Sequence, residues 1–502
     1  MATAFAASLR SRVPGAPVSG RHQGHLLFCL ALMPAAALRV LVMLGYDTAQ
    51  LYWYDSFTYL DTAVHMRPQG AFHPAGYSWF LWLLRPFHSV ELIAGVQHAM
   101  GLGVGVMIYA LLRRRSVPGW GATLAAAPVL FDPSFLRLEH AILSDLQVIF
   151  LLVAALLVVM WREEVSTRAA ALAGLLIALA GLTRTAAAPL LGVVVLHLLL
   201  RRAGWRRVAA AAVAGTLPLV AYAGWYAQHH GRFALSGSDG VALWARTMTF
   251  ADCSLIQPPP EEAALCPNGT VADAASEYVW ASGASLNRLP GDRFSHNDLA
   301  RSFALRAIAA QPLDYLREVA RDTALAFTWE PVRHPRRMNP TTSFPRGSWP
   351  LPERQPLVGQ VRREYDTDIH GMSSVEPYAS VLAAYRYPWF LHGTVFGVVL
   401  LAGGLGAAGL GEGRLRRTAP GAAGRGEAGR GEAGRGEAER RPAVLPWAFA
   451  VFLLVAPVAA LDFDHRYVLP AVPVACVAAA LAVTRTARTL RTRRRRRLSG
   501  GR

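Results

Sequence analysis

The chain has 502 residues, of which 53% are hydrophobic, and several apolar runs are long enough to cross a bilayer, which excludes a soluble enzyme. The net charge of +18 comes from arginines that flank these runs and end the chain, a pattern that indicates membrane topology and argues against a nucleic-acid partner. Composition therefore predicts an all-α polytopic membrane protein.

The first apolar run, at about 26–44, follows a polar segment, 1–25, that carries arginines. A cleaved signal peptide is an alternative, but Arg39 interrupts the run and no small-residue cleavage site follows it. We therefore expect a retained first span, with the N-terminal segment in the cytoplasm.

The next segment, 45–89, is polar and aromatic. Its amphipathic stretch, 77–87, is too short to span a bilayer and is typical of a helix lying in the membrane interface. A second span at about 90–112 ends at the arginine triplet 113–115, which marks the cytoplasmic side. The first loop, which contains Asp55, is therefore expected on the outer side.

The remaining apolar runs predict eight more spans, which makes about ten transmembrane helices with both termini in the cytoplasm. They lie at about 120–131, 141–161, 169–182, 186–200, 208–226, 390–410, 444–461 and 468–483. Arginines at the opposite ends of these spans place every candidate functional residue on the outer side or near it.

The parts between the spans differ in composition. Residues 228–386 form the longest polar region, large enough for a small extracytoplasmic domain with helical spacing in places. The loop 411–442 repeats GRGEA, cannot build a core and is expected to be disordered in the cytoplasm. It interrupts the C-terminal spans, 387–485, and a basic cytoplasmic tail, 486–502, ends the chain.

Two of the four cysteines, Cys253 and Cys266, lie in the outer polar region. They are candidates for a disulfide if this region faces an oxidising compartment. Two free thiols are the alternative.

Asp55 lies in the aromatic stretch LYWYDSFTYLD, near the expected membrane surface. Partial desolvation there would raise the pKa of the carboxyl and make it a usable proton acceptor. The alternative is a solvated loop carboxylate. Asp61, six positions later, would point away from Asp55 on a helix, so Asp55 is the preferred general base.

A second group of ionisable residues lies at the outer end of the fourth span and comprises Glu139, His140 and Asp145. These residues could ligate a divalent cation, but their spacing matches no diagnostic metal motif, and a hydrogen-bonding role at an acceptor site is favoured. His73 is either a turn histidine or a further acceptor-site residue.

Arg184 lies between two apolar runs, and Arg466 lies in the last outer turn beside Tyr467. Guanidinium groups at headgroup depth suit phosphate oxygens, although ordinary interfacial snorkelling explains either arginine alone. The three residues form the predicted phosphate site of the donor.

Five short motifs together resemble the GT-C superfamily of membrane glycosyltransferases, in the branch with the protein O-mannosyltransferases and the lipid A aminoarabinose transferases. The motifs are YDSFTY at 54–59, HPAGY at 73–77, LEHAILSD at 138–145, LTR at 182–184 and HRYVLP at 465–470. The resemblance covers about 26–227 and the last turn. It departs from many relatives at Ser56, where they carry a second acid, and at Asp145, where glutamate is common.

The resemblance implies a polyprenyl-phosphate-linked sugar donor and direct displacement with inversion. Asp55 would be the general base, and Arg184 and Arg466 would hold the leaving phosphate. The expected protein is thus a plasma-membrane glycosyltransferase with an extracytoplasmic active site in 26–227. Its acceptor would be a glycan, a lipid or a protein, and membrane lipids would surround it.

A flippase or transporter of lipid-linked sugars is the main alternative to this function. It would require charges near the bilayer midplane and inverted repeats, whereas no internal repeat is visible and the charges collect on one face. A polymerase or ligase of lipid-linked glycans and a membrane scaffold are further alternatives.

Overall fold

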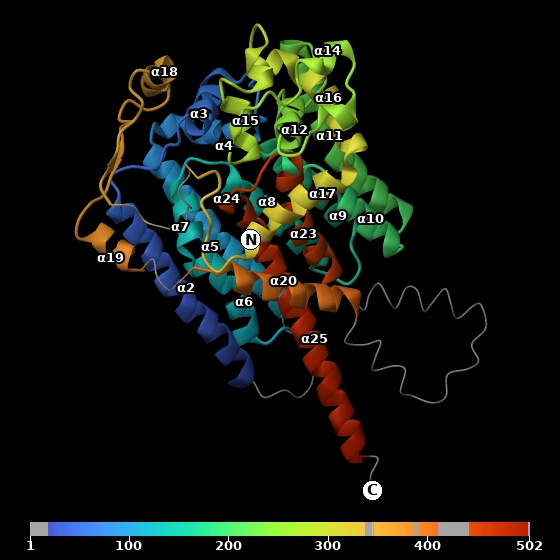
Figure 1. The fold of residues 1–502 in the computed structure, drawn as a ribbon. Helices are drawn as coiled ribbons and strands as arrows, with labels where there is room; N and C mark the ends of the chain where they lie inside the picture. Colours follow the sequence, from blue (N-terminus) through green and yellow to red (C-terminus); the bar gives the residue numbers. More distant parts are fainter. Residues whose placement is uncertain (1–18, 337–343, 345, 386–389, 410–440, 500–502) are drawn as a thin grey trace, which may run out of the picture.

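The computed structural model describes residues 19–336, 344, 346–385, 390–409 and 441–499. Most of the predicted cytoplasmic segment 1–25, of the GRGEA loop 411–442 and the end of the tail lie outside the described residues. The described chain is predominantly helical, as predicted (Figure 1).

In the part of the chain that the structure describes, ten helices are apolar. They are α2 (Ser19–Gly45), α5 (Val90–Arg114), α6 (Gly119–Phe131), α8 (Asp145–Met160), α9 (Thr167–Thr183), α10 (Leu190–Leu200), α11 (Trp205–His230), α20 (Gly393–Ala408), α23 (Val444–Ala460) and α25 (Ala471–Ser499). Four segments are long and apolar enough to cross a membrane: His25–Gly45, Val90–Arg114, Trp205–His230 and His465–Thr492. Six shorter apolar helices of 10–17 residues accompany them, so the chain is a helical membrane protein.

The bundle packs through small residues. Helix α9 contacts α8 and α11, and α25 contacts α20, α23 and α6. A Cβ on Gly174 of α9 would lie 2.1 Å from the carbonyl oxygen of Ala211 in α11, so glycine is needed where these two backbones meet. Large apolar side chains such as Met33 and Leu217 are 69% and 65% exposed, as expected for surfaces that face lipid.

The first loop, between α2 and α5, carries two short helices, α3 (Asp55–His65) and α4 (Gly76–Leu84), followed by the 3-10 turn η1 (Arg85–Phe87). One side of α4 is buried against the protein, whereas Trp82, Leu83 and Phe87 are exposed. This two-sided character agrees with a helix at the membrane interface. Helix α7 (Pro133–His140) and the short helix α24 (His465–Val468) lie in later turns on the same side.

The polar region after α11 folds into short elements. They are α12 (Asp239–Thr247), α13 (Cys253–Ile256), α14 (Pro260–Ala263), α15 (Ala275–Trp280), η3 (Ser285–Arg288), η4 (Arg293–His296), α16 (Asn297–Ala310), α17 (Pro312–Ala324), η5 (Leu325–Phe327), β1 (Ser348–Trp349), α18 (Pro356–Glu364), β2 (Met372–Ser373) and α19 (Tyr378–Tyr385). Strands β1 and β2 pair antiparallel. A further 3-10 turn, η2 (Thr185–Ala187), joins α9 to α10.

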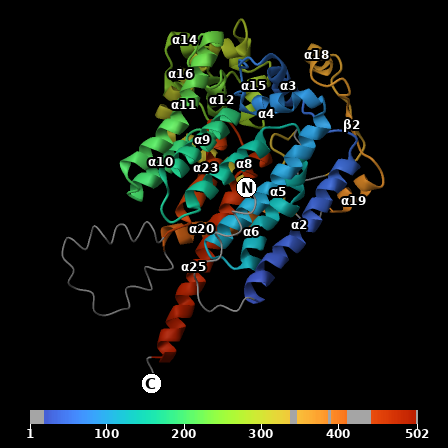
Figure 2. The same ribbon diagram turned by 180° about the vertical axis from the view of Figure 1, so that it is seen from behind.

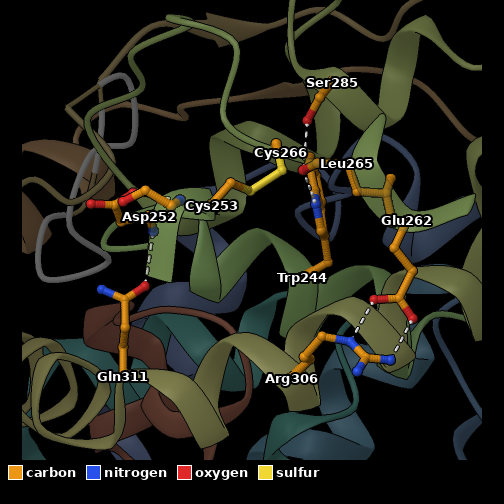
Figure 3. The surroundings of a disulfide bond; sticks show 10 residues. Trp244, Asp252, Cys253, Glu262, Leu265, Cys266, Ser285, Arg306 and Gln311 are labelled. Atoms are coloured by element: carbon orange, nitrogen blue, oxygen red, sulfur yellow. Dashed lines mark hydrogen bonds and ion pairs between the residues drawn. A yellow bond between two sulfur atoms is a disulfide. The ribbon is translucent and has the colours of Figure 1, made fainter. Parts of the chain in front are cut away.

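The elements α12 to α16 form a small core of their own around Trp244, above the helix bundle in Figures 1 and 2. Cys253 and Cys266 are joined by a disulfide, with their Cα atoms 6.0 Å apart. Figure 3 shows this disulfide beside the indole of Trp244, whose Nε1 donates to the carbonyl of Leu265 at 3.1 Å. The bond therefore closes a loop over this core.

Candidate active site

Asp55 begins helix α3, where a carboxylate is favoured by the helix dipole. The preceding residue, Tyr54, has φ 72° and ψ −62°, a conformation that is rare outside glycine. Backbone strain of this kind is found more often at functional positions than elsewhere. The Asp55 carboxylate is 28% exposed, with Oδ1 3.2 Å from His73 Nε2 and Oδ2 3.6 Å from Arg466 Nη1.

The sequence-based expectation of a raised pKa for Asp55 is wrong. Burial does raise the pKa of this carboxyl, but the hydrogen bond and charge of His73, and the charges of Arg466 and Arg184, outweigh it and lower the pKa well below its ordinary value. The error arose because the cationic neighbours come from distant turns of the chain.

A backbone contact holds the first loop against the start of α8. Gln50 N donates to the carbonyl of His140 at 3.0 Å, and Ile142 N donates to the carbonyl of Gln50 at 3.0 Å. The Ser56 hydroxyl adds a 2.8 Å bond to the carbonyl of Ile142. These bonds bring the first turn of α3 beside Asp145, the first residue of α8.

The two arginines of the predicted phosphate site converge on this place. Arg184 ends α9 and pairs through Nη1 with Asp145 Oδ1, and Arg466 Nε lies 3.8 Å from the same oxygen. Both guanidinium groups lie over the Tyr467 ring, at 4.9 Å for Arg184 and 5.5 Å for Arg466. The structure thus joins Asp55, Asp145 and the two arginines in one site.

Local contacts fix the positions of both arginines. Gly76 allows the start of α4 to touch the chain just before Arg184, since a Cβ there would lie 2.5 Å from the carbonyl oxygen of Leu182. Asp464 caps α24 by accepting from Arg466 N at 2.8 Å. Arg466 Nε is buried and has no hydrogen-bond partner among the described residues, so the site retains a donor for a ligand.

Aromatic and hydroxyl groups line the same site, and sequence reasoning missed them. The Tyr59 hydroxyl lies 2.9 Å from Ser144 Oγ, and the Tyr59 ring lies 4.6 Å from that of His73. Tyr59 is four residues after Asp55, so the helical spacing of α3 already puts both side chains on one face.

Asp61, the rejected alternative to Asp55, has other partners. Its carboxylate accepts from Gln69 Nε2 at 3.0 Å and Gln360 Nε2 at 3.3 Å, and lies 3.0 Å from His65 Nδ1. Asp61 therefore links α3 to α18, and its role is to hold these two helices together.

The predicted second group does not stay together. Glu139 is fully buried, and its two oxygens lie 2.7 Å from Arg39 Nη2 and 2.8 Å from His98 Nδ1. His140 Nε2 lies 3.0 Å from the carbonyl oxygen of Thr48. Burial, and then the charge of His98, lower the pKa of His140 to about 3, so this ring is neutral. Glu139 therefore ties α7 to α2 and α5, and His140 braces the first loop, whereas Asp145 belongs to the site with the arginines.

Removing Arg39 is expected to destabilise the protein by about 3–5 kcal/mol, because Arg39→Met leaves Glu139 as a buried, incompletely paired charge. Adding Glu139→Gln should recover much of the loss, since the second change removes that charge. Thermal unfolding of the two variants in detergent measures both effects. Equal stabilities of Arg39→Met and wild type would contradict a structural role for the pair.

A different set of residues gathers potential metal ligands. Asp322, His334 and Asp462 offer ligand atoms that all lie within 4.8 Å of one another, in the part of the chain that the structure describes. However, His334 Nε2 lies 2.7 Å from Asp462 Oδ1, and Arg246 pairs with Asp322. Burial opposes protonation of His334, but Asp462 raises the pKa of the imidazole overall. Ion pairing among α12, α17, the segment around His334 and the last turn accounts for this cluster.

The described apolar helices define a polytopic membrane protein. At one end of these helices, carboxylates and arginines are grouped in one charged site. No protein-family model matches the chain, and no curated protein matches its sequence.

Among the solved structures that are similar to the chain are three from different organisms. The Saccharomyces cerevisiae protein O-mannosyltransferase Pmt1–Pmt2 complex bound to the sugar donor has 15% identity, covering 54% of this chain and 39% of that chain, with a TM-score of 0.33. The Archaeoglobus fulgidus oligosaccharyltransferase has 13% identity, 92% and 50% coverage, and a TM-score of 0.40. ArnT from Cupriavidus metallidurans has 13% identity, 92% and 78% coverage, and a TM-score of 0.34.

The predicted resemblance to the GT-C superfamily is confirmed as a resemblance, since a protein O-mannosyltransferase is among these structures. The alignments span half or less of the length of the first two proteins.

Proposed function

We propose that this protein is a membrane glycosyltransferase that moves a sugar from a polyprenyl-phosphate donor to an acceptor hydroxyl at the extracytoplasmic surface. One observation carries the proposal: two arginines and a tyrosine converge beside Asp55, and one buried arginine nitrogen, Arg466 Nε, has no hydrogen-bond partner among the described residues. An anionic phosphate beside a carboxylate base is what such a site suits.

The reaction is a single displacement. The acceptor oxygen attacks the anomeric carbon of the donor sugar, while the bond from that carbon to the phosphate oxygen breaks. Asp55 takes the proton of the acceptor hydroxyl, and polyprenyl phosphate leaves with the electron pair. Arg184 and Arg466 hold the charge that develops on this phosphate, with Tyr467 beneath them. Attack opposite the leaving group inverts the anomeric centre.

The donor also explains how Asp55 serves as a base despite its low pKa in the free protein. Arg466 lies between Asp55 and Asp145, and its positive charge lowers the pKa of Asp55. A bound phosphate shares that positive charge, so the proton affinity of Asp55 rises when the donor is in place. His73 keeps the carboxylate oriented from the other side.

The proposed topology keeps ten spans, both termini in the cytoplasm, and the site on the outer face of the plasma membrane. The arginine-rich ends of the apolar helices support this orientation. The disulfide between Cys253 and Cys266 supports an oxidising location for 228–386, the proposed extracytoplasmic domain. The catalytic module would be 26–227 together with the last outer turn.

Chelation of divalent ions is expected to leave transfer activity unchanged. Glu139 and Asp145 both have arginine partners, so a cation would have to displace a guanidinium group from a carboxylate that is almost fully buried. Transfer measured with and without EDTA tests this. Loss of activity with EDTA and recovery with one divalent ion would instead assign a metal to the site.

The function is tested with the full chain in vesicles that contain polyprenyl-phosphate sugars. Production of free polyprenyl phosphate in step with glycosylated acceptor supports the enzyme. Movement of the intact lipid-linked sugar between leaflets without cleavage supports the transporter alternative. Mass spectrometry of lipid-linked sugars and glycans in a deletion strain then identifies the donor, which accumulates, and the acceptor product, which is lost.

A further inference from the structure

A basic cavity of about 940 Å³ lies at the end of the helix bundle away from Asp55. Helix α5 starts beside the first outer loop at Val90 and reaches the cavity at Arg114, and its 25 residues span about 37 Å. Figures 1 and 2 show the last helix, α25, running in the same direction, away from α3 and α15. The cavity is thus separate from the candidate active site.

Five arginines and one acid line this basic cavity. The arginines are Arg114, Arg115, Arg162, Arg485 and Arg488, and the acid is Glu163. Among the described residues, no carboxylate forms an ion pair with Arg114, Arg115, Arg162 or Arg488. Burial, and then the charge of Arg201, lower the pKa of Arg115, with Glu163 opposing them. The cavity therefore concentrates positive charge, with Glu163 as the one acid among its described lining residues.

The positions of these arginines are fixed by backbone contacts. Arg114 Nε donates to the carbonyl of Trp161 at 3.2 Å, and Arg115 donates to the carbonyls of Met160 and Arg162 at 2.7 and 3.1 Å. Arg488 of α25 donates to the carbonyl of Ser116. The ends of α5 and α8 are thereby joined to each other and to the middle of α25, which fixes the wall of the cavity.

Two apolar grooves adjoin the basic cavity, and each shares a different set of lining residues with it. The first, of about 570 Å³, lies along α20 and α25 and shares Pro442, Leu481 and Arg485 with the cavity. The second, of about 410 Å³, lies at the junction of α8 and α9 and shares Trp161 and Arg162 with it. Leu405 and Leu490 in the first groove are 56% and 53% exposed.

The geometry points to a binding site for an anionic phospholipid with two acyl chains, its phosphate headgroup in the basic cavity and one chain in each apolar groove. Charge complementarity selects an anionic headgroup, because a zwitterionic headgroup would place its own cation among the arginines. The two separate apolar grooves that adjoin one cavity select a diacyl lipid over a free phosphate or a single-chain carrier.

The probes are short-chain phosphatidylglycerol, short-chain phosphatidylcholine and inorganic phosphate, each titrated against the purified full chain in a non-ionic detergent. The readout is the thermal unfolding midpoint, which rises with any ligand that binds the folded state. Phosphatidylglycerol is expected to raise the midpoint at concentrations where the other two have little effect. Equal shifts with phosphatidylcholine, or the full shift with phosphate alone, would overturn the lipid assignment.

Variants locate the binding. Arg162→Gln with Arg488→Gln is expected to weaken phosphatidylglycerol binding about twenty-five-fold, since each arginine near an anionic headgroup contributes about fivefold. Arg206→Gln is the matched control, because Arg206 is an exposed arginine that lies over Trp205 and does not line the basic cavity. Ala487→Trp adds bulk to the first groove and should weaken the binding of the lipid but not the binding of phosphate. Unchanged lipid affinity in the double variant would disprove the site.

Discussion

Sugar transfer by Asp55→Asn is expected to fall by about 10²–10⁴-fold in kcat, because an amide does not accept the proton of the acceptor hydroxyl. The amide oxygen still accepts a hydrogen bond from His73, so the local geometry is retained. Donor binding should be unchanged or tighter, since Arg466 loses an anionic neighbour that competes with phosphate. Single-turnover transfer in vesicles measures the step directly.

Asp61→Asn is the matched control for this variant. It removes a carboxylate from the same helix, six positions away, where the partners are His65, Arg67, Gln69 and Gln360 rather than Arg184 and Arg466. Its transfer rate should stay close to that of wild type. Normal turnover by Asp55→Asn, or an equal loss in both variants, would show that Asp55 is not the base.

The pH dependence of activity should separate the free protein from the donor complex. The acidic limb of kcat/KM reports the free protein, where the pKa of Asp55 is lowered, so this limb should lie below the ordinary aspartate range of about 3.9. The limb of kcat should lie at higher pH, because bound phosphate shares the charge of the arginines. Superimposed limbs would contradict coupling between donor and base.

The membrane class and the grouping of Asp55 with Arg184 and Arg466 follow from local features of the sequence. Apolar runs indicate the segments that lie in lipid, and arginines at the ends of these runs indicate the cytoplasmic side of the membrane. Residues in distant turns of the chain can therefore be assigned to the same side of the membrane. The short runs at α6 and α10 contain 13 and 11 residues, less than a bilayer needs in an untilted helix, so run length alone does not settle each span.

Side-chain partners were harder to predict than sidedness. Glu139 and His140 looked like neighbours of Asp145 because they are close in the chain, but Glu139 pairs with Arg39, a residue one hundred positions away. His73 looked like a turn residue, and its contact with Asp55 depends on how the loop folds back over 18 residues. Such contacts are set by tertiary packing, which no local pattern encodes.

Arg466→Gln is expected to lower kcat/KM by about 10²–10³-fold, because the variant removes a preorganised donor to the leaving phosphate. Asp145 keeps its pairing with Arg184, so the loss should not come from an unpaired buried carboxylate. Arg466→Lys should recover part of the rate, since it restores the charge but not the planar fork. Arg346→Gln, at an exposed arginine paired with Glu376, is the control.

Product binding decides whether Arg466 acts on phosphate or only on Asp55. If it holds phosphate, Arg466→Gln should weaken inhibition by free polyprenyl phosphate as well as slow transfer. The same variant should move the acidic limb of kcat/KM to higher pH, because one of the charges that lower the pKa of Asp55 is gone. A shifted limb with unchanged product inhibition would leave Arg466 as a positioning residue for Asp55 and assign the phosphate to Arg184 alone.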